Sequence, residues 1–269
     1  MIYEKISLKE KGSQDYPNLT LYIQEYSDDI AIEKRPLIII CPGGGYEYTS
    51  DREAEPIALS FMAKGFHAAV LRYSVAPSIY PTALLELGRS IAIIRSKATE
   101  YHIDKDKIAV FGASAGGHLA ADFACEWKDG FIEKELGVSE EDIRPNGLLL
   151  AYPVITSGKF AHRGSFVNLL GDHYDELVEK VSLEKRVNEN VPPVFMWHTF
   201  TDGSVPVENS LLFASALREK NINTELHIFP VGGHGLALAN KLTLSHHKKE
   251  DFEQVVVWID LATTWLNNL

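Results

Sequence analysis

Five short runs of apolar residues recur along the chain, and turn-forming residues follow them. The runs lie at residues 37–41, 66–73, 108–111, 147–154 and 194–198. Apolar runs of this length predict strands that are buried on both faces of a sheet. Residues 2–8 and 17–26 alternate between apolar and polar side chains instead, and this pattern predicts antiparallel edge strands with one face in solvent.

Segments with helical spacing separate these strands. Residues 82–101 place Leu84, Leu87, Ile91 and Ile94 on one face of a long helix. We also predict helices at 53–65, from the residue after 114 to about 128, at 207–220 and at 249–266, and a strand at 224–229. Strands that alternate with helices predict an α/β fold with a mostly parallel central sheet and helices on both faces.

Residues 155–190 fit this alternation poorly. Their charges are mixed and their periodicity is weak, and one helix is predicted there at 175–181. Neither a repeat nor a low-complexity tract nor a linker interrupts the sequence. We therefore expect a single domain over residues 1–269 with a small insertion at about 155–190.

The apolar run at 108–111 leads directly into Gly-Ala-Ser-Ala-Gly, with Ser114 at its centre. Small residues on both sides are what a sharp strand-to-helix turn around a serine requires. The G-x-S-x-G pattern therefore predicts a nucleophile elbow, although a lone match also occurs around serines without a chemical role. The other parts of an acyl-transfer site have to come from elsewhere in the chain.

A serine nucleophile needs a base, because its hydroxyl is scarcely ionised at neutral pH. His234 is the best placed of the ten histidines, because it stands in Gly-Gly-His-Gly, five residues after Phe229. His118 falls on the helix after the elbow, and His198 ends a strand, where we expect it to pack or to bond a carbonyl group. His234 is therefore the predicted base.

The base must be held in one tautomer by a carboxylate. Asp202 comes four residues after the strand 194–198, on a loop that precedes a helix. Glu208 is the alternative, but it falls in the first turn of that helix. The resulting chain order of serine, aspartate and histidine is a known order for catalytic triads, and all three residues follow the carboxyl ends of predicted strands.

An ester carbonyl that is attacked by serine develops a negative charge that needs hydrogen-bond donors. The N–H group of Ala115 comes with the elbow, and those of Gly44 and Gly45 come from three glycines directly after the strand 37–41. Three glycines could also cradle a phosphate. Because neither G-x-x-x-x-G-K-[ST] nor G-x-G-x-x-G is present there, we favour an oxyanion hole.

Composition narrows the range of partners. A net charge of −11 and a pI of about 5.4 argue against nucleic acid and an anionic membrane surface. Cys41 and Cys125 lie in apolar surroundings outside any C-x-x-C pair, which argues against a disulfide or a thiolate metal site. The start of the chain has no apolar signal segment and no run is long enough to span a membrane, so we expect a cytoplasmic protein.

Five segments together resemble a known family. They are CPGGGYEYTS at 41–50, FHAAVLRYSVAP at 66–77, YHIDKDKIAVFGASAGGHLAA at 101–121, WHTFTDGSVPVENSLLFASAL at 197–217 and FPVGGHG at 229–235. In this order they are similar to the α/β-hydrolase esterases, specifically the bacterial acetyl xylan esterase and carbohydrate esterase group. The sequence departs from that group in two places. Pro42 stands where related lipases often have histidine before the glycines, and Phe200 and Thr201 precede Asp202 where the group often has smaller or acidic residues.

The resemblance implies a serine esterase with Ser114 as nucleophile, Asp202 as acid, His234 as base, and Gly44, Gly45 and Ala115 as oxyanion hole. The expected substrate is a small acyl ester, above all an acetylated sugar such as an imported acetylated xylo-oligosaccharide. The predicted mechanism needs neither a metal nor an organic cofactor. A homo-oligomer is left open, as are a broad carboxylesterase, a peptidase and a catalytically inactive binding module on the same fold.

Aromatic side chains near the mouth of the site could stack on sugar rings. We predict Tyr46 and Phe200 as substrate-binding residues and place Tyr48 and Arg52 near them. Ordinary packing of these side chains is an equally good interpretation of the sequence.

Overall fold

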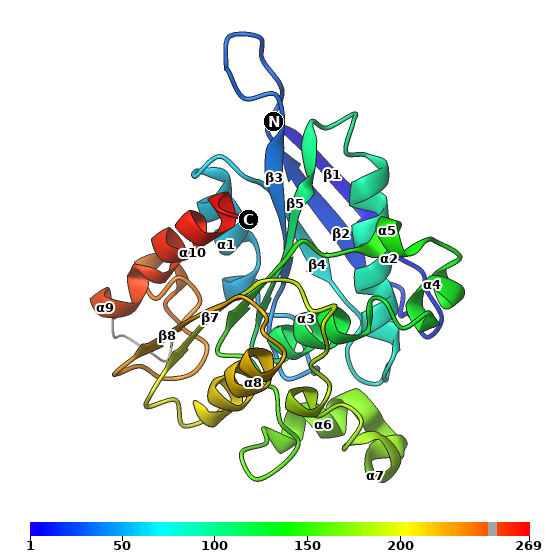
Figure 1. The fold of residues 1–269 in the computed structure, drawn as a ribbon, viewed down its shortest axis with the longest axis vertical. Helices are drawn as coiled ribbons and strands as arrows, with labels where there is room; N and C mark the ends of the chain where they lie inside the picture. The colour runs from blue at the N-terminus through cyan, green and yellow to red at the C-terminus, as the bar shows by residue number, and fades with distance from the viewer. Residues whose placement is uncertain (247–251) are drawn as a thin grey trace.

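The computed structural model describes residues 1–246 and 252–269, and a sheet of eight strands runs through them (Figure 1). Their order across the sheet is β1-β2-β4-β3-β5-β6-β7-β8. The strands are β1 Ile2–Ser7, β2 Asn18–Ile23, β3 Arg35–Cys41, β4 His67–Arg72, β5 Ile103–Ala113, β6 Gly147–Ala151, β7 Val194–Thr199 and β8 Thr224–Phe229. The pairs β1–β2 and β2–β4 are antiparallel and the others are parallel, which confirms the predicted mostly parallel sheet.

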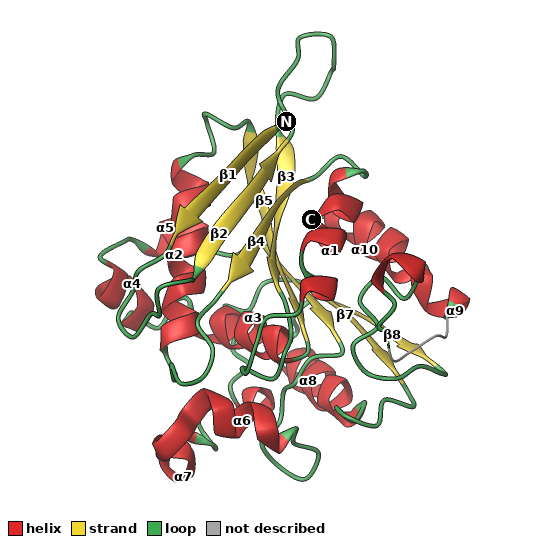
Figure 2. Cartoon of the chain, turned by 180° about the vertical axis from the view of Figure 1, so that it is seen from behind, coloured by secondary structure: helices red, strands yellow, loops and turns green. Residues whose placement is uncertain are grey.

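Helices cover both faces of the sheet (Figure 2). They are α1 Glu55–Met62, α2 Thr82–Ser96, α3 Ala115–Glu126, α4 Phe131–Leu136, α5 Glu140–Ile143, α6 Arg163–Leu170, α7 Tyr174–Leu177, α8 Glu208–Glu219, α9 Glu253–Val256 and α10 Trp258–Asn267. Short 3₁₀ helices are η1 Asp51–Glu53, η2 Gly171–His173, η3 Leu183–Lys185 and η4 Lys241–Thr243. Helices α2, α3 and α8 lie on one face, and α1 and α10 lie on the other.

The buried strands supply side chains to both cores because successive residues of a strand point to opposite faces. In β3, Leu37 and Ile39 pack under α2 and α3, whereas Ile38 and Ile40 pack under α1 and α10. Each fully buried aliphatic side chain of this size contributes about 1.5–3 kcal/mol to folding. The uniformly apolar runs in the sequence therefore correspond to strands covered on both sides.

The expectation for residues 17–26 was right about antiparallel pairing and wrong about an edge position. Strand β2 is not an edge strand, because it pairs with both β1 and β4, and all six of its residues are buried. Its polar residues were taken to face solvent, but their side chains find hydrogen-bond partners inside the protein. Thr20 donates to Asn18, and the Tyr22 hydroxyl donates to Glu55. Strand β1 does lie at the edge, and its residues alternate between half-buried and exposed as predicted.

Several predicted helices differ from the observed ones in length. Helix α2 ends at Ser96 rather than at residue 101, and α1 is shorter than the predicted 53–65 and is preceded by η1. In the insertion, the helix predicted at 175–181 is the single turn α7, and the longer α6 was not predicted. Part of the predicted helix 249–266 lies outside the described residues, and the rest forms α9 and α10.

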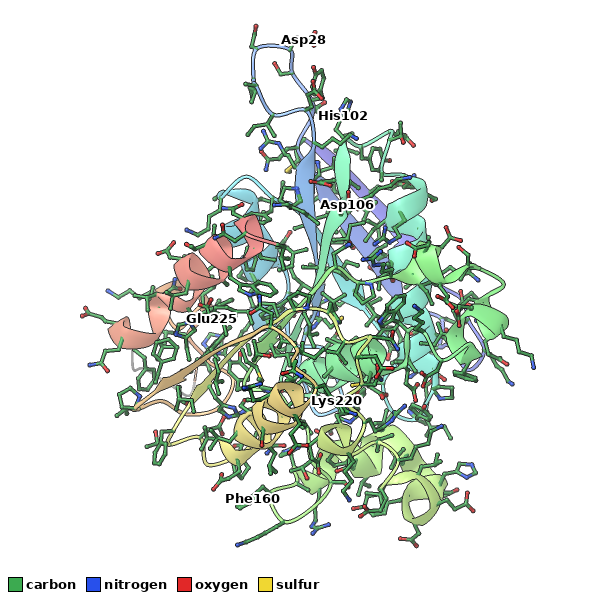
Figure 3. All side chains as sticks on the ribbon, viewed as in Figure 1. Asp28, His102, Asp106, Phe160, Lys220 and Glu225 are labelled. Carbon is green, nitrogen blue, oxygen red and sulfur yellow. The ribbon has the colours of Figure 1, made fainter. Side chains whose placement is uncertain are left out.

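The two ends of the sheet carry different structures. A loop between β2 and β3 projects from the amino end of β3, with Asp28 near its tip (Figure 3). Helices α6 and α7 of the insertion lie at the opposite end of the molecule (Figure 1). Within the described residues, none of the helices is long and apolar enough to cross a membrane.

Candidate active site

Ser114 occupies a sharp turn between β5 and α3. Its φ of 53° and ψ of −120° place it in a region that residues with a Cβ rarely adopt, at a cost of about 1–3 kcal/mol. The turn is held in place because the Ser114 N–H donates to the Ala151 carbonyl (3.0 Å) and the Ser114 carbonyl accepts from Val154 and His118 (3.0 and 3.1 Å). This strained turn is the geometry predicted for a nucleophile elbow.

Three residues that are distant in the sequence form one hydrogen-bonded line. Ser114 Oγ lies 2.7 Å from His234 Nε2, and His234 Nδ1 lies 2.7 Å from Asp202 Oδ2. Because a carboxylate can only accept, Nδ1 carries the proton and Nε2 accepts from the serine hydroxyl. The structure thus brings together the three residues that the sequence analysis placed in one site.

The Asp202 carboxylate is buried, and the protein supplies it with several hydrogen bonds. Its Oδ1 accepts from the N–H groups of Ser204 and Val205 at 2.9 and 3.0 Å. Burial would raise the pKa of Asp202, but the hydrogen bonds from His198 and His234 outweigh it and hold the pKa well below its usual range. Asp202 is therefore a stable anion beneath the imidazole of His234.

Two other residues behave as the sequence indicated. His198 is fully buried, and its Nε2 donates to the carbonyl of Val205 at 3.0 Å, while its Nδ1 bonds Ser210 Oγ at 2.8 Å. Glu208 begins α8, away from His234 Nδ1, whose carboxylate partner is Asp202.

The turn at residues 43–45 approaches the elbow closely. A Cβ built on Gly43 would come within 2.8 Å of Ser114 Cβ, so only glycine fits there. Within the described residues, the N–H groups of Gly44, Gly45 and Ala115 have no hydrogen-bond acceptor. Gly44 and Gly45 line the same cavity as Ser114, and Ala115 opens the first turn of α3, where N–H groups are unpaired.

Glu53 is a buried residue of this site that the sequence analysis missed, because it falls at the start of a predicted helix. It is 3% exposed, and its carboxylate accepts from the Gly43 N–H at 2.9 Å and from the Tyr152 hydroxyl at 2.7 Å. The Tyr152 ring in turn meets the His234 ring edge-on, with centroids 5.1 Å apart. Glu53 thereby braces both the glycine turn and the neighbourhood of the base.

A cavity of about 350 Å³ opens beside Ser114 and His234. Tyr48 and Arg52 line it, as expected from the sequence. Tyr46 and Phe200, the predicted substrate-binding residues, do not line this cavity. Tyr46 is 3% exposed because its ring packs inward against Tyr73 and its hydroxyl bonds His118 Nδ1 at 3.0 Å, and Phe200 is 65% exposed outside the cavity.

His162, from the insertion, also lines the cavity. Its Nδ1 lies 2.9 Å from Ser165 Oγ. Burial lowers the pKa of His162, the nearby His234 lowers it further, and Asp202 opposes both. No sequence motif marks this residue, because its position depends on how the insertion folds over the site.

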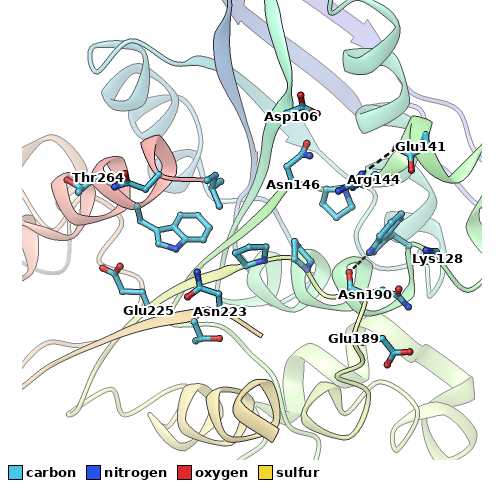
Figure 4. A pocket seen from close by; sticks show the side chains of 18 of the residues that line it. Asp106, Lys128, Glu141, Arg144, Asn146, Glu189, Asn190, Asn223, Glu225 and Thr264 are labelled. Carbon is cyan, nitrogen blue, oxygen red and sulfur yellow. Dashed lines mark hydrogen bonds and ion pairs between the residues drawn. The ribbon is translucent and has the colours of Figure 1, made fainter. Parts of the chain in front are cut away.

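A second, larger cavity of about 1030 Å³ lies at the amino ends of β6, β7 and β8 (Figure 4). Asn146, Asn223 and Glu225 are among its lining residues, and Trp127 in its wall donates to the Asn190 carbonyl at 2.9 Å. Ligands of parallel α/β sheets bind at the carboxyl ends of the strands. The smaller cavity at Ser114 is therefore the candidate active site.

The described residues hold no group of three or more histidine, cysteine, aspartate or glutamate side chains with the geometry of a metal site. Cys41 and Cys125 are both buried and free.

The sheet order and the strand–serine–helix turn define the chain as an α/β hydrolase. Residues 23–217 match the BD-FAE family, and the chain therefore belongs to that family of α/β hydrolases. The predicted fold class and the predicted resemblance are both confirmed.

Two curated relatives of this chain carry the names of a xylanase and of an acetylxylan esterase. The chain is 40% identical over 231 residues to endo-1,4-beta-xylanase B of Butyrivibrio fibrisolvens, covering 83% of this chain and 35% of that protein. It is 28% identical over 205 residues to an acetylxylan esterase of Xylanibacter ruminicola, covering 74% of this chain and 40% of that protein. The chain thus spans well under half the length of both curated relatives.

Among solved structures, the acetyl ester-xyloside bifunctional hydrolase from Caldicellulosiruptor lactoaceticus is 37% identical, with a TM-score of 0.83, and the match covers 98% of this chain and 96% of that one. These names support the predicted class of carboxylic ester hydrolase.

Proposed function

We propose that this protein is a serine esterase that hydrolyses small acyl esters through Ser114, His234 and Asp202. The observation that carries the proposal is the line from Ser114 Oγ through the imidazole to the carboxylate, with both hydrogen bonds at 2.7 Å. This line opens on a cavity large enough for a small ester.

The first half-reaction forms an acyl-enzyme. Ser114 Oγ attacks the ester carbonyl carbon while its proton passes to His234 Nε2. The carbonyl electron pair moves onto oxygen, and the N–H groups of Gly44, Gly45 and Ala115 are the proposed donors to that oxyanion. When the carbonyl re-forms, the C–O bond to the alcohol breaks and the alkoxide takes the proton from His234.

The second half-reaction releases the acid. Water donates a proton to His234 Nε2 and attacks the acyl carbon, and collapse of the second tetrahedral intermediate returns the proton to Ser114 Oγ. Throughout the cycle, the negative charge of Asp202 stabilises the imidazolium form of His234 and keeps Nδ1 directed at the carboxylate. No step uses a redox change.

The proposed substrate is an acetyl ester on a sugar hydroxyl, such as an acetylated xylo-oligosaccharide. The names of the acetylxylan esterase and of the acetyl ester-xyloside hydrolase support this choice. Tyr48 and Arg52 of the cavity offer an aromatic ring and hydrogen-bond donors, two features that suit a sugar. The match to part of a xylanase does not by itself extend xylan backbone cleavage to this chain.

The first experiment tests both the reaction and the nucleophile. The purified protein should hydrolyse p-nitrophenyl acetate, and Ser114→Ala should abolish turnover while the melting temperature stays near that of the wild type. Mass spectrometry of acetylated xylo-oligosaccharides should show losses of 42 Da per acetyl group with the wild type only, as expected for replacement of an acetyl group by hydrogen. A Ser114→Ala variant that retains most of the activity would refute the assignment.

A screen of acyl groups then separates the related activities. Wild-type rates on acetyl, butyryl, feruloyl and aminoacyl substrates should be highest for acetyl. Equal rates on butyryl and acetyl esters would instead indicate a broad carboxylesterase, and cleavage of aminoacyl substrates a peptidase. Labelling of Ser114 by a fluorophosphonate, absent in Ser114→Ala, distinguishes an active enzyme from a binding module.

A further inference from the structure

Every carbonyl group in the turn at residues 43–46 accepts a hydrogen bond. Backbone N–H groups donate to three of these carbonyl groups. The Gly43 carbonyl accepts from Ser50 at 2.8 Å, and the Tyr46 carbonyl accepts from Ala76 at 2.8 Å. The Gly44 carbonyl accepts from Glu47 and Tyr48 at 3.0 and 3.2 Å. The fourth, the carbonyl of Gly45, accepts from Nδ2 of Asn168 at 2.8 Å. In the described structure, Gly45 is thus the one member of the turn whose carbonyl is held by a side chain.

Two N–H groups of the same turn, unlike its carbonyl groups, have no hydrogen-bond partner among the described residues. Those of Gly44 and Gly45 have no acceptor within the described residues, and both residues line the cavity beside Ser114. A peptide unit is planar, so holding the carbonyl of Gly45 fixes the plane that Gly45 shares with the Tyr46 N–H. This plane limits rotation about the Cα of Gly45 and so restrains the neighbouring plane, which carries the Gly45 N–H. Gly45 has a φ of 64° and no Cβ, so its own sterics restrict the turn little.

Asn168 can hold the turn because its own helix is fixed to the rest of the protein. It lies on α6 of the insertion, whose Phe166 is buried and packs edge-on against His118 with ring centroids 5.3 Å apart. The Leu169 carbonyl next to it accepts from the Tyr80 N–H at 2.8 Å. Further along the insertion, Arg186 pairs with Asp122 of α3 at 2.8 Å.

We propose that Asn168 is a positioning residue for the oxyanion hole: its side-chain amide holds the Gly45 peptide so that the free N–H groups of the glycine turn face the reacting carbonyl. Asn168 does not line the cavity and acts through Gly45. The insertion is then a structural part of the catalytic site as well as a cover over it. This inference rests on the proposed esterase function.

The test removes the donor in two ways. Asn168→Ala deletes the amide, and Asn168→Asp keeps the size of the side chain but replaces the donor with a carboxylate oxygen. One lost hydrogen bond that orients an oxyanion donor should lower kcat on p-nitrophenyl acetate by about tenfold or more, with KM within about twofold. Phenylboronic acid, which forms a tetrahedral adduct on a serine nucleophile, should bind both variants about tenfold more weakly.

Asn188 offers a matched control on the same insertion. It is also half-buried, and its Nδ2 donates to a backbone carbonyl, that of Cys125, at 2.8 Å. Asn188→Ala also loses a bond to the Arg186 carbonyl and one from the Asn190 N–H, so it should lower the melting temperature at least as much as Asn168→Ala. It should nevertheless leave kcat and the boronate affinity unchanged. A purely structural role for Asn168 would give the two alanine variants the same kinetics.

Two outcomes overturn the inference without touching the esterase proposal. One is wild-type kcat in both Asn168 variants, and the other is a fall in kcat without any loss of boronate affinity. If Asn168→Ala does not fold, the equally sized Asn168→Asp decides the matter. An inactive wild-type protein would instead refute the proposed function itself.

Discussion

The Asp202 carboxylate combines burial with a full set of hydrogen bonds. Its side chain is inaccessible to solvent, yet it accepts from two backbone N–H groups and from His234, and His198 lies 3.4 Å away. An enclosed charge is tolerated only with such partners. The same partners orient the carboxylate toward His234 and thereby select the tautomer that can accept the proton of Ser114.

The substitution Asp202→Asn tests this role. The amide oxygen can still accept from Ser204 and Val205, so the loop should keep its shape, but the amide N–H₂ would face His234 Nδ1 and favour the wrong tautomer. We expect kcat at neutral pH to fall by about 10³ to 10⁴. Steady-state kinetics with p-nitrophenyl acetate measure this, with circular dichroism as the control for folding. A fall of less than tenfold would argue that the carboxylate does not orient the base.

Some site residues were predictable from sequence and others were not, for a physical reason. Ser114 and His234 stand in glycine-rich turns after strands, and the local sequence specifies that setting. Tyr46 follows the same kind of turn, but the direction of its ring depends on a buried partner, His118, that is distant in the sequence. His162 enters the cavity from a segment without periodicity.

At the scale of whole elements, the crossing of α3 over the end of β3 sets the distance between the elbow and the glycine turn. A Cβ built on Gly116, in the first turn of α3, would lie 2.1 Å from the Cys41 carbonyl oxygen and 2.5 Å from that of Pro42. Backbone atoms cannot move aside as a flexible side chain can. Helix and strand can therefore approach this closely only with glycine at this position.

Gly116→Ala should accordingly push α3 away from β3. We expect a loss of about 1–3 kcal/mol in the free energy of unfolding, as is typical of overpacking, together with a lower kcat. Gly203→Ala is the control, because a Cβ there meets no atom within 4 Å, and it should change stability by less than about 0.5 kcal/mol. Urea unfolding curves measure both, and equal stabilities for the two variants would contradict the argument.

The sequence pattern located several strands correctly. The strand predicted at 224–229 has the observed bounds of β8, and the apolar runs at 37–41 and 194–198 fall within β3 and β7. Strand β2 was misjudged because its polar groups are satisfied internally. Helix α6 was not predicted because the packing of Phe166 against His118 of α3 stabilises it, and a local sequence pattern does not report such a contact.

At the scale of the molecule, buried histidines join segments that are far apart. His118 of α3 accepts from the Tyr46 hydroxyl through Nδ1, and its Nε2 lies 2.9 Å from the carbonyl of Val181 in the insertion. Since that carbonyl can only accept, His118 is a neutral ring with its proton on Nε2. One imidazole thus connects the elbow helix, the glycine turn and the insertion.

Burial lowers the pKa of His118 to about 4. The unfolded state, with a pKa of about 6.5, binds this proton before the folded state does, so stability is lost as the pH falls from about 6.5 toward 4. We expect His118→Gln, which cannot titrate, to lose about 2–3 kcal/mol less than the wild type between pH 7 and pH 4.5. Denaturant unfolding at both pH values measures this, and parallel losses in the two proteins would exclude His118 as the cause.

The linear order of residues was enough to indicate an α/β fold, the strand-to-helix turn around Ser114 and the distant partners Asp202 and His234. These features are local: apolar runs encode buried strands, and small residues encode tight turns. Which side chains surround the cavity was decided by tertiary packing. Glu53, His162 and Asn168 reach the site from η1 and the insertion, and their positions depend on long-range contacts that no window of sequence contains.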